Sequence, residues 1–247
     1  RYHLTLCDGA LELCVVKVRE GAEVIGKTFM SGFFNHGLYR VVAIKRGQET
    51  IIPTGQDEIK ADDIVYAVCT RENMKALREQ LGKQKKEIRN IIFFGGSQIA
   101  QQTVQNLPDD LRLKILEADR EHCYHLSEKV NNALIINADG SDMAVLKDEG
   151  IEDADAFVAV TDNSEANIFA CMAAKRFGVK KTIAEVENID YISMAEGLDI
   201  GTVLNKKTIA ASYIYQMLLD ASVLNVRNLT TADAELVEFM AEEGSRI

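Results

Sequence analysis

A pair of glycines that follows an apolar run is the first feature of this sequence whose residue types suggest chemistry. Residues 91–94 (IIFF) lead directly into Gly95 and Gly96, and residues 97–100 (SQIA) continue with helical character. A strand, a glycine turn and a helix in this order place free backbone N–H groups at the positive end of the helix dipole, where they bind phosphate. The residues predicted to form this site are Gly95, Gly96, Ser97, Gln98 and Ile99.

The turn departs from the dinucleotide pattern G-x-G-x-x-G/A at its second glycine, where Ser97 stands between Gly95 and Ala100. That glycine normally allows close approach of the backbone to a pyrophosphate. A serine there crowds the ligand by roughly an ångström, or donates a hydrogen bond to a shifted phosphate. The loss is on the order of 1–3 kcal/mol, so we expect weakened or altered binding. An empty, purely structural pocket stays open as the alternative.

An acidic residue strengthens the nucleotide interpretation. Glu117 lies 22 positions beyond Gly95, at the end of the next predicted strand, 113–117. A carboxylate at this place accepts hydrogen bonds from ribose hydroxyls and disfavours a 2′-phosphate. The sequence therefore predicts NAD(H) or an adenine nucleotide (ATP or ADP) as ligand, and not NADP.

Other chemical groups are sparse. His122 and His125 are spaced three apart, as two metal ligands on a helix would be, but the apolar stripe Cys123, Leu126 and Val130 points elsewhere. We predict that these histidines face solvent and that no metal binds. The sequence has no nucleophile elbow, Walker lysine or His–Glu zinc helix.

Two regions with different patterns of predicted secondary structure position these groups. Residues 1–82 are predicted to form short strands, with a hairpin around Gly47 and a closing helix capped by Thr70 and ended by Gly82. From residue 88 strands and helices are predicted to alternate. The strands are expected at 91–94, 113–117, 133–137, 156–160, 182–186 and near 203. The helices include one whose apolar stripe is Ile99, Thr103, Val104 and Leu107, and two others at 141–150 and 164–177. The expected fold class is α/β: a Rossmann-like, doubly wound parallel sheet preceded by a small, β-rich α+β domain.

Composition limits the class of protein. The 247 residues are 47% hydrophobic with no apolar run near the roughly 20 residues of a membrane span, so no direct membrane insertion is expected. A net charge of −10 argues against nucleic-acid binding, and the basic cluster in 82–89 is interpreted as a solvated connector. Five scattered cysteines without CxxC spacing indicate reduced thiols in the cytoplasm.

The end of the sequence repeats its beginning. Residues 235–247 match residues 12–24 at a constant offset of 223, with Glu, Leu, Glu-Gly and a final branched aliphatic residue in common. We interpret this as the start of a second copy of the small domain. Because the first residue is Arg1 and not Met, the chain is expected to be an internal piece of a tandem-repeat protein.

Longer stretches resemble the RCK (also called KTN) family, essentially over the whole chain. Residues 137–142 (NADGSD) are similar to the family's G-D-A-T, and residues 160–167 (VTDNSEAN) to its L-T-x-D-D-E-x-N. In the small domain, residues 20–28 (EGAEVIGKT) are similar to E-G-S-x-L-x-G-K-T, and residues 51–63 to I-I-P-x-G-D…A-G-D.

The resemblance implies four segments: an RCK C-terminal subdomain (1–82), a linker (83–90), an RCK N-terminal, NAD-binding Rossmann-like domain (91–220) and the start of a second C-terminal subdomain (221–247). It assigns Glu117 to the ribose, Asp139 to the adenine side, Thr161 and Asp162 to the middle of the ligand, and Arg120 to phosphate. The other residues that it places at the site are Ala118, Asp119, Ala138, Gly140 and Asn163.

The same resemblance implies a non-enzymatic regulatory subunit, cytoplasmic and peripheral at the inner face of the plasma membrane. Its partner would be a membrane potassium-translocating subunit of the Trk type, gated as nucleotide rearranges a ring of RCK units. The apolar helix 206–219 is expected to form a homo-oligomer interface, the alternative being a helix enclosed within the chain. An NAD-dependent oxidoreductase and a non-binding structural RCK copy are the competing functions.

Overall fold

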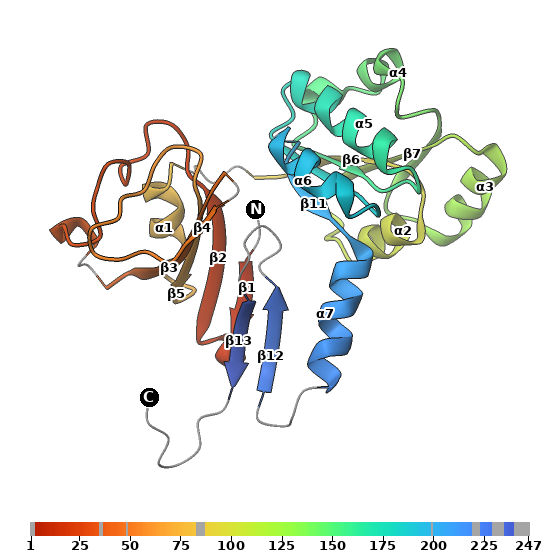
Figure 1. Cartoon of the computed structure of the whole chain (residues 1–247). Helices are drawn as coiled ribbons and strands as arrows, with labels where there is room; N and C mark the ends of the chain where they lie inside the picture. Colours follow the sequence, from red (N-terminus) through yellow and green to blue (C-terminus); the bar gives the residue numbers. More distant parts are fainter. Residues whose placement is uncertain are drawn as a thin grey trace. The chain divides into compact units, whose positions relative to one another are not determined.

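The computed structural model describes residues 3–34, 37–47, 49–82, 87–198, 200–218, 223–228 and 235–239. The chain divides into two compact units, Arg1–Lys85 with Ala210–Ile247, and Lys86–Ile209. Both are drawn in Figure 1.

An antiparallel sheet is the centre of the first unit. Its strands lie in the order β1-β2-β5-β3-β4. The elements are β1 (His3–Leu6), β2 (Leu11–Lys17), β3 (Tyr39–Arg46), β4 (Glu49–Ile51), β5 (Ile64–Cys69) and α1 (Met74–Gln80). The predicted hairpin is confirmed, since Arg46 pairs with Glu49 and Gly47 has φ +58°.

Both faces of this sheet are buried. Successive side chains of a strand point to opposite faces, so β2 contributes Cys14 and Val16 to one apolar cluster and Leu13 and Val15 to another. Leu77 of α1 belongs to the first cluster. The predicted cap is wrong: Asn73, not Thr70, precedes the helix, and no side chain caps it.

The second unit confirms the predicted parallel sheet (Figure 1). Its strands lie in the order β11-β10-β9-β6-β7-β8, which reverses between β6 and β9. The strands are β6 (Asn90–Phe94), β7 (Arg112–Glu117), β8 (Leu134–Asn137), β9 (Ala156–Ala159), β10 (Lys181–Glu185) and β11 (Thr202–Leu204). In a doubly wound sheet, ligands bind beyond the carboxyl ends of the strands at such a reversal.

Helices connect these strands, and a last helix follows β11. They are α2 (Gln98–Gln105), α3 (Arg120–Lys129), α4 (Met143–Asp148), α5 (Ser164–Arg176), α6 (Asp190–Gly197) and α7 (Lys206–Leu218). Ala100 and Val104 of α2 are buried, but Thr103, which was placed on the same apolar stripe, is exposed. The sequence did not predict α6 or β1.

A two-stranded sheet follows α7 and reproduces the pairing of the first two strands. In it β12 (Val223–Asn228) pairs with β13 (Glu235–Phe239). Val226 faces Val237 and Asn228 faces Glu235, which are the pairs His3–Cys14 and Thr5–Glu12 shifted by the offset of 223. The two segments therefore share their strand pairing register as well as their sequence pattern. Most of residues 219–247, where the second copy was predicted, lie outside the described residues.

Candidate functional site

The turn after β6 requires glycine at its first position. Gly95 has φ +94°, and its N–H donates to Leu116 O at 2.9 Å. A Cβ on Gly95 would lie 2.7 Å from Thr161 Cγ2 and 3.0 Å from Thr161 N. Any other residue would combine an unfavourable φ with a steric clash against the end of β9. The tight turn predicted at Gly95 is present.

Gly96 is held on both sides by hydrogen bonds. Its N–H donates to Glu117 Oε2 at 2.8 Å, and its carbonyl accepts from Gln101 Nε2 at 3.1 Å. A Cβ at this position would collide with the side chain of Leu126. The turn is thus held by contacts with α2, β7 and α3.

Ser97 is the N-cap of α2, and its Oγ accepts from Ala100 N at 3.5 Å. The backbone N–H groups of Ser97, Gln98 and Ile99 have no hydrogen-bond acceptor among the described residues. Such unsatisfied donors are inherent to the first turn of a helix. Three N–H groups therefore remain open where a phosphate is predicted.

Glu117 is placed between the glycine turn and α3. Its Oε1 accepts from Asp119 N at 2.9 Å, and its Oε2, which accepts from Gly96 N, lies 3.4 Å from His122 Nδ1. Its backbone carbonyl accepts from Asn137 Nδ2 at 3.0 Å. Each carboxylate oxygen can accept more than one hydrogen bond, so lone pairs remain for ribose hydroxyls. His122, which was predicted to face solvent, is 40% exposed and also lies next to Glu117, whereas His125 is 62% exposed.

The remaining predicted residues near β7 and β8 mostly have local roles. Asp119 caps α3 by accepting from His122 N at 2.9 Å, and Asp139 Oδ1 accepts from Ser141 N at 2.9 Å. The Arg120 guanidinium lies 6.0 Å from the Tyr124 ring centroid and 3.4 Å from its hydroxyl. Ala118 O accepts from Asn137, Ala138 N donates to Glu117 O, and a Cβ on Gly140 would collide with the Phe94 ring.

A buried polar network occupies the opposite side of the strand reversal. The side chain of Asn167, on α5, is fully buried. Its Oδ1 accepts from Thr161 Oγ1 at 2.7 Å and Thr161 N at 3.1 Å, and its Nδ2 donates to Thr161 O and Glu185 O, both at 2.9 Å. All four hydrogen-bonding positions of the amide are used. Thr161, which is predicted to contact the middle of the ligand, is thus hydrogen-bonded to Asn167. It also lies directly against Gly95.

The same network continues to the start of α7. Lys206 Nζ lies 2.5 Å from Glu185 Oε1 and 2.8 Å from Glu187 Oε1, and Glu185 is only 1% exposed. Hydrogen bonding to Glu185 raises the pKa of Lys206, and hydrogen bonding to Lys206 lowers the pKa of Glu187. Asn205, which precedes α7, donates to Val186 O at 2.7 Å and accepts from Thr208 N at 2.8 Å.

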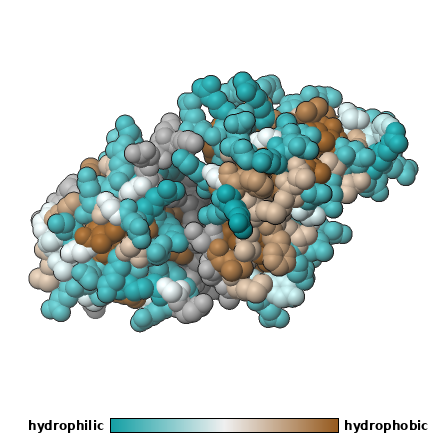
Figure 2. Space-filling model, turned by 90° about the horizontal axis from the view of Figure 1, so that it is seen from above, coloured by the Kyte–Doolittle hydropathy of each residue, from teal (hydrophilic) through white to brown (hydrophobic). Residues whose placement is uncertain are grey.

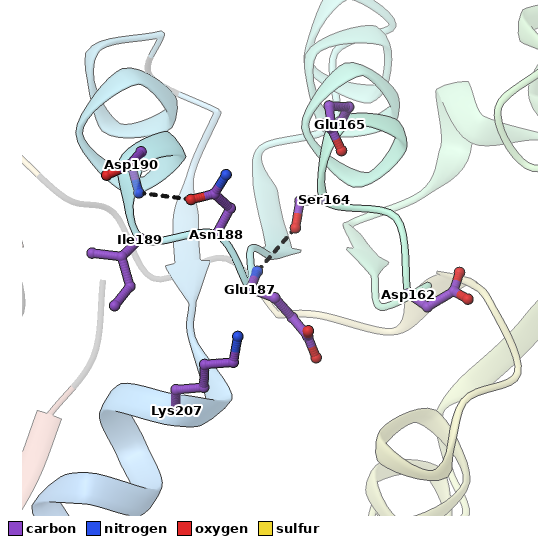
Figure 3. Close-up of a pocket in the computed structure, with 8 residues that line it drawn as sticks. All are labelled: Asp162, Ser164, Glu165, Glu187, Asn188, Ile189, Asp190 and Lys207. Carbon is purple, nitrogen blue, oxygen red and sulfur yellow. Dashed lines mark hydrogen bonds between the residues drawn. The ribbon is translucent and has the colours of Figure 1, made fainter.

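An open pocket of about 580 Å³, with four acidic residues among its eight lining residues, lies beyond the ends of β9 and β10 (Figure 3). Glu187 N donates to Ser164 Oγ at 2.9 Å across its back, and Asn188 Oδ1 accepts from Asp190 N at 3.0 Å. The pocket is lined by Asp162, Ser164, Glu165, Glu187, Asn188, Ile189, Asp190 and Lys207. Asp162 is the predicted site residue here; Asn163 instead caps α5 by accepting from Ala166 N at 2.8 Å.

Two further properties bear on the predicted chemistry. Within the described residues, no group of three or more His, Cys, Asp or Glu side chains is arranged to hold a metal ion. In the same part of the chain, no helix is long and apolar enough to cross a membrane.

Apolar side chains are exposed on the last three helices. Figure 2 shows apolar residues, in brown and tan, at the surface among hydrophilic ones. The exposed large apolar residues of these helices include Phe169 and Met172 on α5, Met194 on α6, and Ile209, Tyr213, Ile214, Tyr215, Met217 and Leu218 on α7.

Comparison with known proteins agrees with this geometry. Residues 13–82 match the TrkA-C domain family, and residues 91–206 match the TrkA-N domain family. The chain belongs to the family of proteins built from TrkA-C and TrkA-N domains.

Curated relatives carry the same domains. The chain is 28% identical over 242 residues to the Trk system potassium uptake protein TrkA of Halomonas elongata, covering 96% of this chain and 52% of the relative. It is 30% identical over 209 residues to the trkA homolog 1 of Methanosarcina mazei, covering 84% of this chain and 52% of the relative. The chain thus spans about half the length of these TrkA proteins.

Solved structures share the fold. The GsuK RCK domain superposes with a TM-score of 0.59 at 17% identity, covering 88% of this chain and 47% of that one. The GsuK channel bound to NAD gives a TM-score of 0.58 at 16% identity, covering 87% of this chain and 38% of that one. The RCK fold predicted from the sequence motifs is confirmed.

Proposed function

We propose that this chain is a nucleotide-binding regulatory module of a Trk-type potassium uptake system. The observation that carries the proposal is the preformed turn at Gly95–Gly96. It leaves three N–H groups open at the start of α2 and places the Glu117 carboxylate 2.8 Å from Gly96 N. Backbone donors for phosphate beside an acid for ribose are the two requirements of a dinucleotide site.

The ligand we propose is NAD(H) or an adenine nucleotide. A relative in fold, GsuK, has been solved with NAD bound, which supports this ligand class. Glu117 would accept from the ribose hydroxyls and repel a 2′-phosphate, so NADP should bind more weakly. The N-cap role of Ser97 keeps its side chain at the phosphate end of the site, so we expect reduced affinity.

The partner and the assembly follow from the relatives and from the exposed helices. The TrkA proteins are named for potassium uptake, so we infer a membrane potassium-translocating subunit as partner and a cytoplasmic, peripheral location. A second copy of the chain would cover the apolar residues of α7. Nucleotide would act by rearranging a ring of such units. In this proposal residues 1–82 form the first RCK C-terminal subdomain and residues 83–90 a linker. Residues 91–220 form the second RCK N-terminal domain, and residues 221–247 the start of the second RCK C-terminal subdomain.

Thermal unfolding of the purified chain with NAD, NADH, NADP, ATP, ADP and AMP tests the proposal. A ligand at 100 times its Kd adds about 2.7 kcal/mol to the free energy of unfolding. We expect stabilisation by NAD(H) or an adenine nucleotide, little by NADP, and loss of the effect in Glu117→Ala. The control is Glu121→Ala, an exposed acid four residues further on, in the first turn of α3, which should respond to ligand as the unaltered chain does.

Two outcomes would contradict this function. No stabilisation by any nucleotide at millimolar concentration would leave a structural RCK copy that binds nothing. Oxidation of a substrate coupled to NAD reduction would instead support the oxidoreductase.

A further inference from the structure

We propose that Glu187 joins the second half of a dinucleotide to helix α7, so that NAD stabilises the start of this helix and ADP does not. The inference rests on the proposed function, because it concerns the same ligand. It deepens that function by assigning a ligand group to the pocket beyond β9 and β10, and by naming the residue through which this group acts on the rest of the chain.

The pocket begins one residue away from the glycine turn. Thr161 lies directly against Gly95, and the next residue, Asp162, lines the pocket. A dinucleotide binds across a strand reversal of this kind, with one half on each side. ADP at the Gly95 turn and Glu117 would therefore not reach the pocket, whereas NAD would extend its second ribose and its nicotinamide into it.

The charges of the pocket suit a ribose better than a further phosphate. Its acidic lining residues are Asp162, Glu165, Glu187 and Asp190, and Lys207 is the one basic lining residue. Carboxylates accept hydrogen bonds from ribose hydroxyls and repel phosphate oxygens. The half of NAD beyond the pyrophosphate carries no phosphate of its own except the one that joins it to ADP, so it fits this lining.

A buried hydroxyl in the pocket is also open to a ligand. Ser164, at the start of α5, is 8% exposed and lines the pocket. Its Oγ accepts from Glu187 N at 2.9 Å, and its own proton has no acceptor among the residues that the structure describes. The pocket therefore offers one buried donor beside its carboxylates.

Glu187 has one carboxylate oxygen in use and one open. Its Oε1 lies 2.8 Å from Lys206 Nζ, and in the described part of the chain no group donates a hydrogen bond to its Oε2. The side chain is 42% exposed and extends into the space between Asp162 and Lys207 (Figure 3). A ribose hydroxyl can therefore donate to Oε2 while Oε1 keeps its ion pair.

The backbone of Glu187 is held to the start of α7 as well. Its carbonyl accepts from Asn205 Nδ2 at 3.1 Å, and Asn205 Oδ1 accepts from Thr208 N, in the first turn of the helix, at 2.8 Å. The division between the two units of the chain falls within α7, between Ile209 and Ala210. A change in the order of its first turn therefore concerns a helix that belongs to both units.

The sign of the coupling follows from these contacts. A ribose that holds the Glu187 carboxylate in place strengthens its ion pair with Lys206, and so stabilises the first turn of α7. Because coupling between two sites is reciprocal, loss of Lys206 weakens NAD binding by the factor by which NAD stabilises this turn. For partly exposed groups the expected factor is about three- to tenfold.

Calorimetric titration with NAD and with ADP, combined with hydrogen exchange of peptides that cover residues 205–214, tests the proposal. Glu187→Ala removes the contact with ligand and with α7, and Lys206→Met leaves the carboxylate in the pocket but disconnects it from the helix. The control is Glu152→Ala, an exposed acid between α4 and β9. Thermal unfolding without ligand confirms that each variant folds.

The proposal predicts a distinct outcome for each protein. In the unaltered chain and in Glu152→Ala, saturating NAD should slow exchange at residues 205–214 about three- to tenfold, and ADP should leave it unchanged. Glu187→Ala should weaken NAD binding by about the same factor and ADP binding less than about twofold. Lys206→Met should weaken NAD relative to ADP and abolish the exchange response.

Other results would overturn it. NAD affinity that is unchanged in Glu187→Ala, or lost equally with ADP affinity, would show that the second half of NAD does not bind at Glu187. Exchange at α7 that does not respond to bound NAD would overturn the coupling. Absence of binding of both nucleotides would overturn the proposed function, and this inference with it.

Discussion

The two sides of the strand reversal between β6 and β9 are built in opposite ways. On the β6–β7 side, three N–H groups at the start of α2 are open and Glu117 is partly exposed. On the β9–β10 side, Asn167 uses all its hydrogen-bonding positions and Glu185 is paired with Lys206 in a buried position. The first side offers open backbone N–H groups to a ligand, whereas the second contains a buried amide whose hydrogen-bonding positions are all used within the chain.

We expect this difference to separate the residues that bind a ligand from those that hold the site in place. Buried polar networks specify one arrangement when every member is satisfied, and they are costly when one partner is lost. Thr161 belongs to the β9–β10 network and also touches the position where Gly95 would carry a Cβ. Substitutions within the buried network of the β9–β10 side should therefore reduce stability first, and those on the β6–β7 side should change ligand affinity at little cost in stability.

The largest effect is expected from Asn167→Ala. The substitution removes three hydrogen bonds to the partly buried Thr161 and one to the buried Glu185 O, which should lower the free energy of unfolding by about 3 kcal/mol or more. Urea unfolding measures the loss. The control is Asn137→Ala on the β6–β7 side, where an exposed asparagine also donates to two carbonyls. That change should cost about 0.5–1.5 kcal/mol, and an equal loss in both variants would break the comparison.

The second effect concerns Lys206→Met, which removes the cation from the buried Glu185 carboxylate. We expect a loss of about 1–3 kcal/mol in the free energy of unfolding at pH 7, discounted because Lys206 is itself half exposed. Lys207→Met, next to it on α7, is the control and should be nearly neutral.

The pH dependence of this loss has a defined sign. Lys206 lowers the pKa of Glu187, so its stabilising effect is present above the ordinary glutamate pKa of about 4.3 and is lost as the pH falls through the lowered value. Unfolding curves from pH 7 to pH 3 should therefore converge for the unaltered chain and Lys206→Met. A gap that persists at pH 3 would show that the lysine acts by packing alone.

The smallest change in stability, with a gain in affinity, is expected from Ser97→Gly. Glycine restores close backbone approach to a phosphate, so nucleotide affinity should rise about tenfold, the lower end of the serine penalty. Replacement of an N-cap serine by glycine costs only a few tenths of a kcal/mol. Calorimetric titration and thermal unfolding of the same sample give both numbers. Unchanged or weaker binding would show that the Ser97 hydroxyl contributes to the site.

Local patterns in the sequence were sufficient to predict most of the strands and the glycine turn. The run at 91–94 and the spacing from Gly95 to Glu117 reflect forces that act within one βα unit, and the structure places both as expected. Strand β1 was missed because the four residues HLTL carry no signal apart from their pairing with β2. Thr70 was misassigned as a cap because the intervening turn lets the helix begin three residues later, after Asn73.

The contacts within the site could be predicted less well than the residues that make it. Asn167, Glu185 and Lys206 come from three elements, and their spacing along the chain does not reveal that one amide joins two strands. His122 was assigned to solvent because the apolar stripe of α3 points elsewhere. Its approach to Glu117 depends on how α3 begins after β7, a property of the tertiary arrangement. The ligand contacts of the predicted site residues stay predictions.

The duplicated hairpin has a consequence for how the chain folds. Because β12–β13 has the register of β1–β2, it could compete for the edge of β5 that β2 occupies, a route to strand exchange. At the offset of 223, Glu238 stands where β2 has the buried Val15. Exchange would bury a carboxylate without a cation, and in the native arrangement Glu238 accepts from Cys7 N at 2.6 Å instead. A single acidic side chain thus disfavours the misfolded isomer that the repeat would otherwise permit.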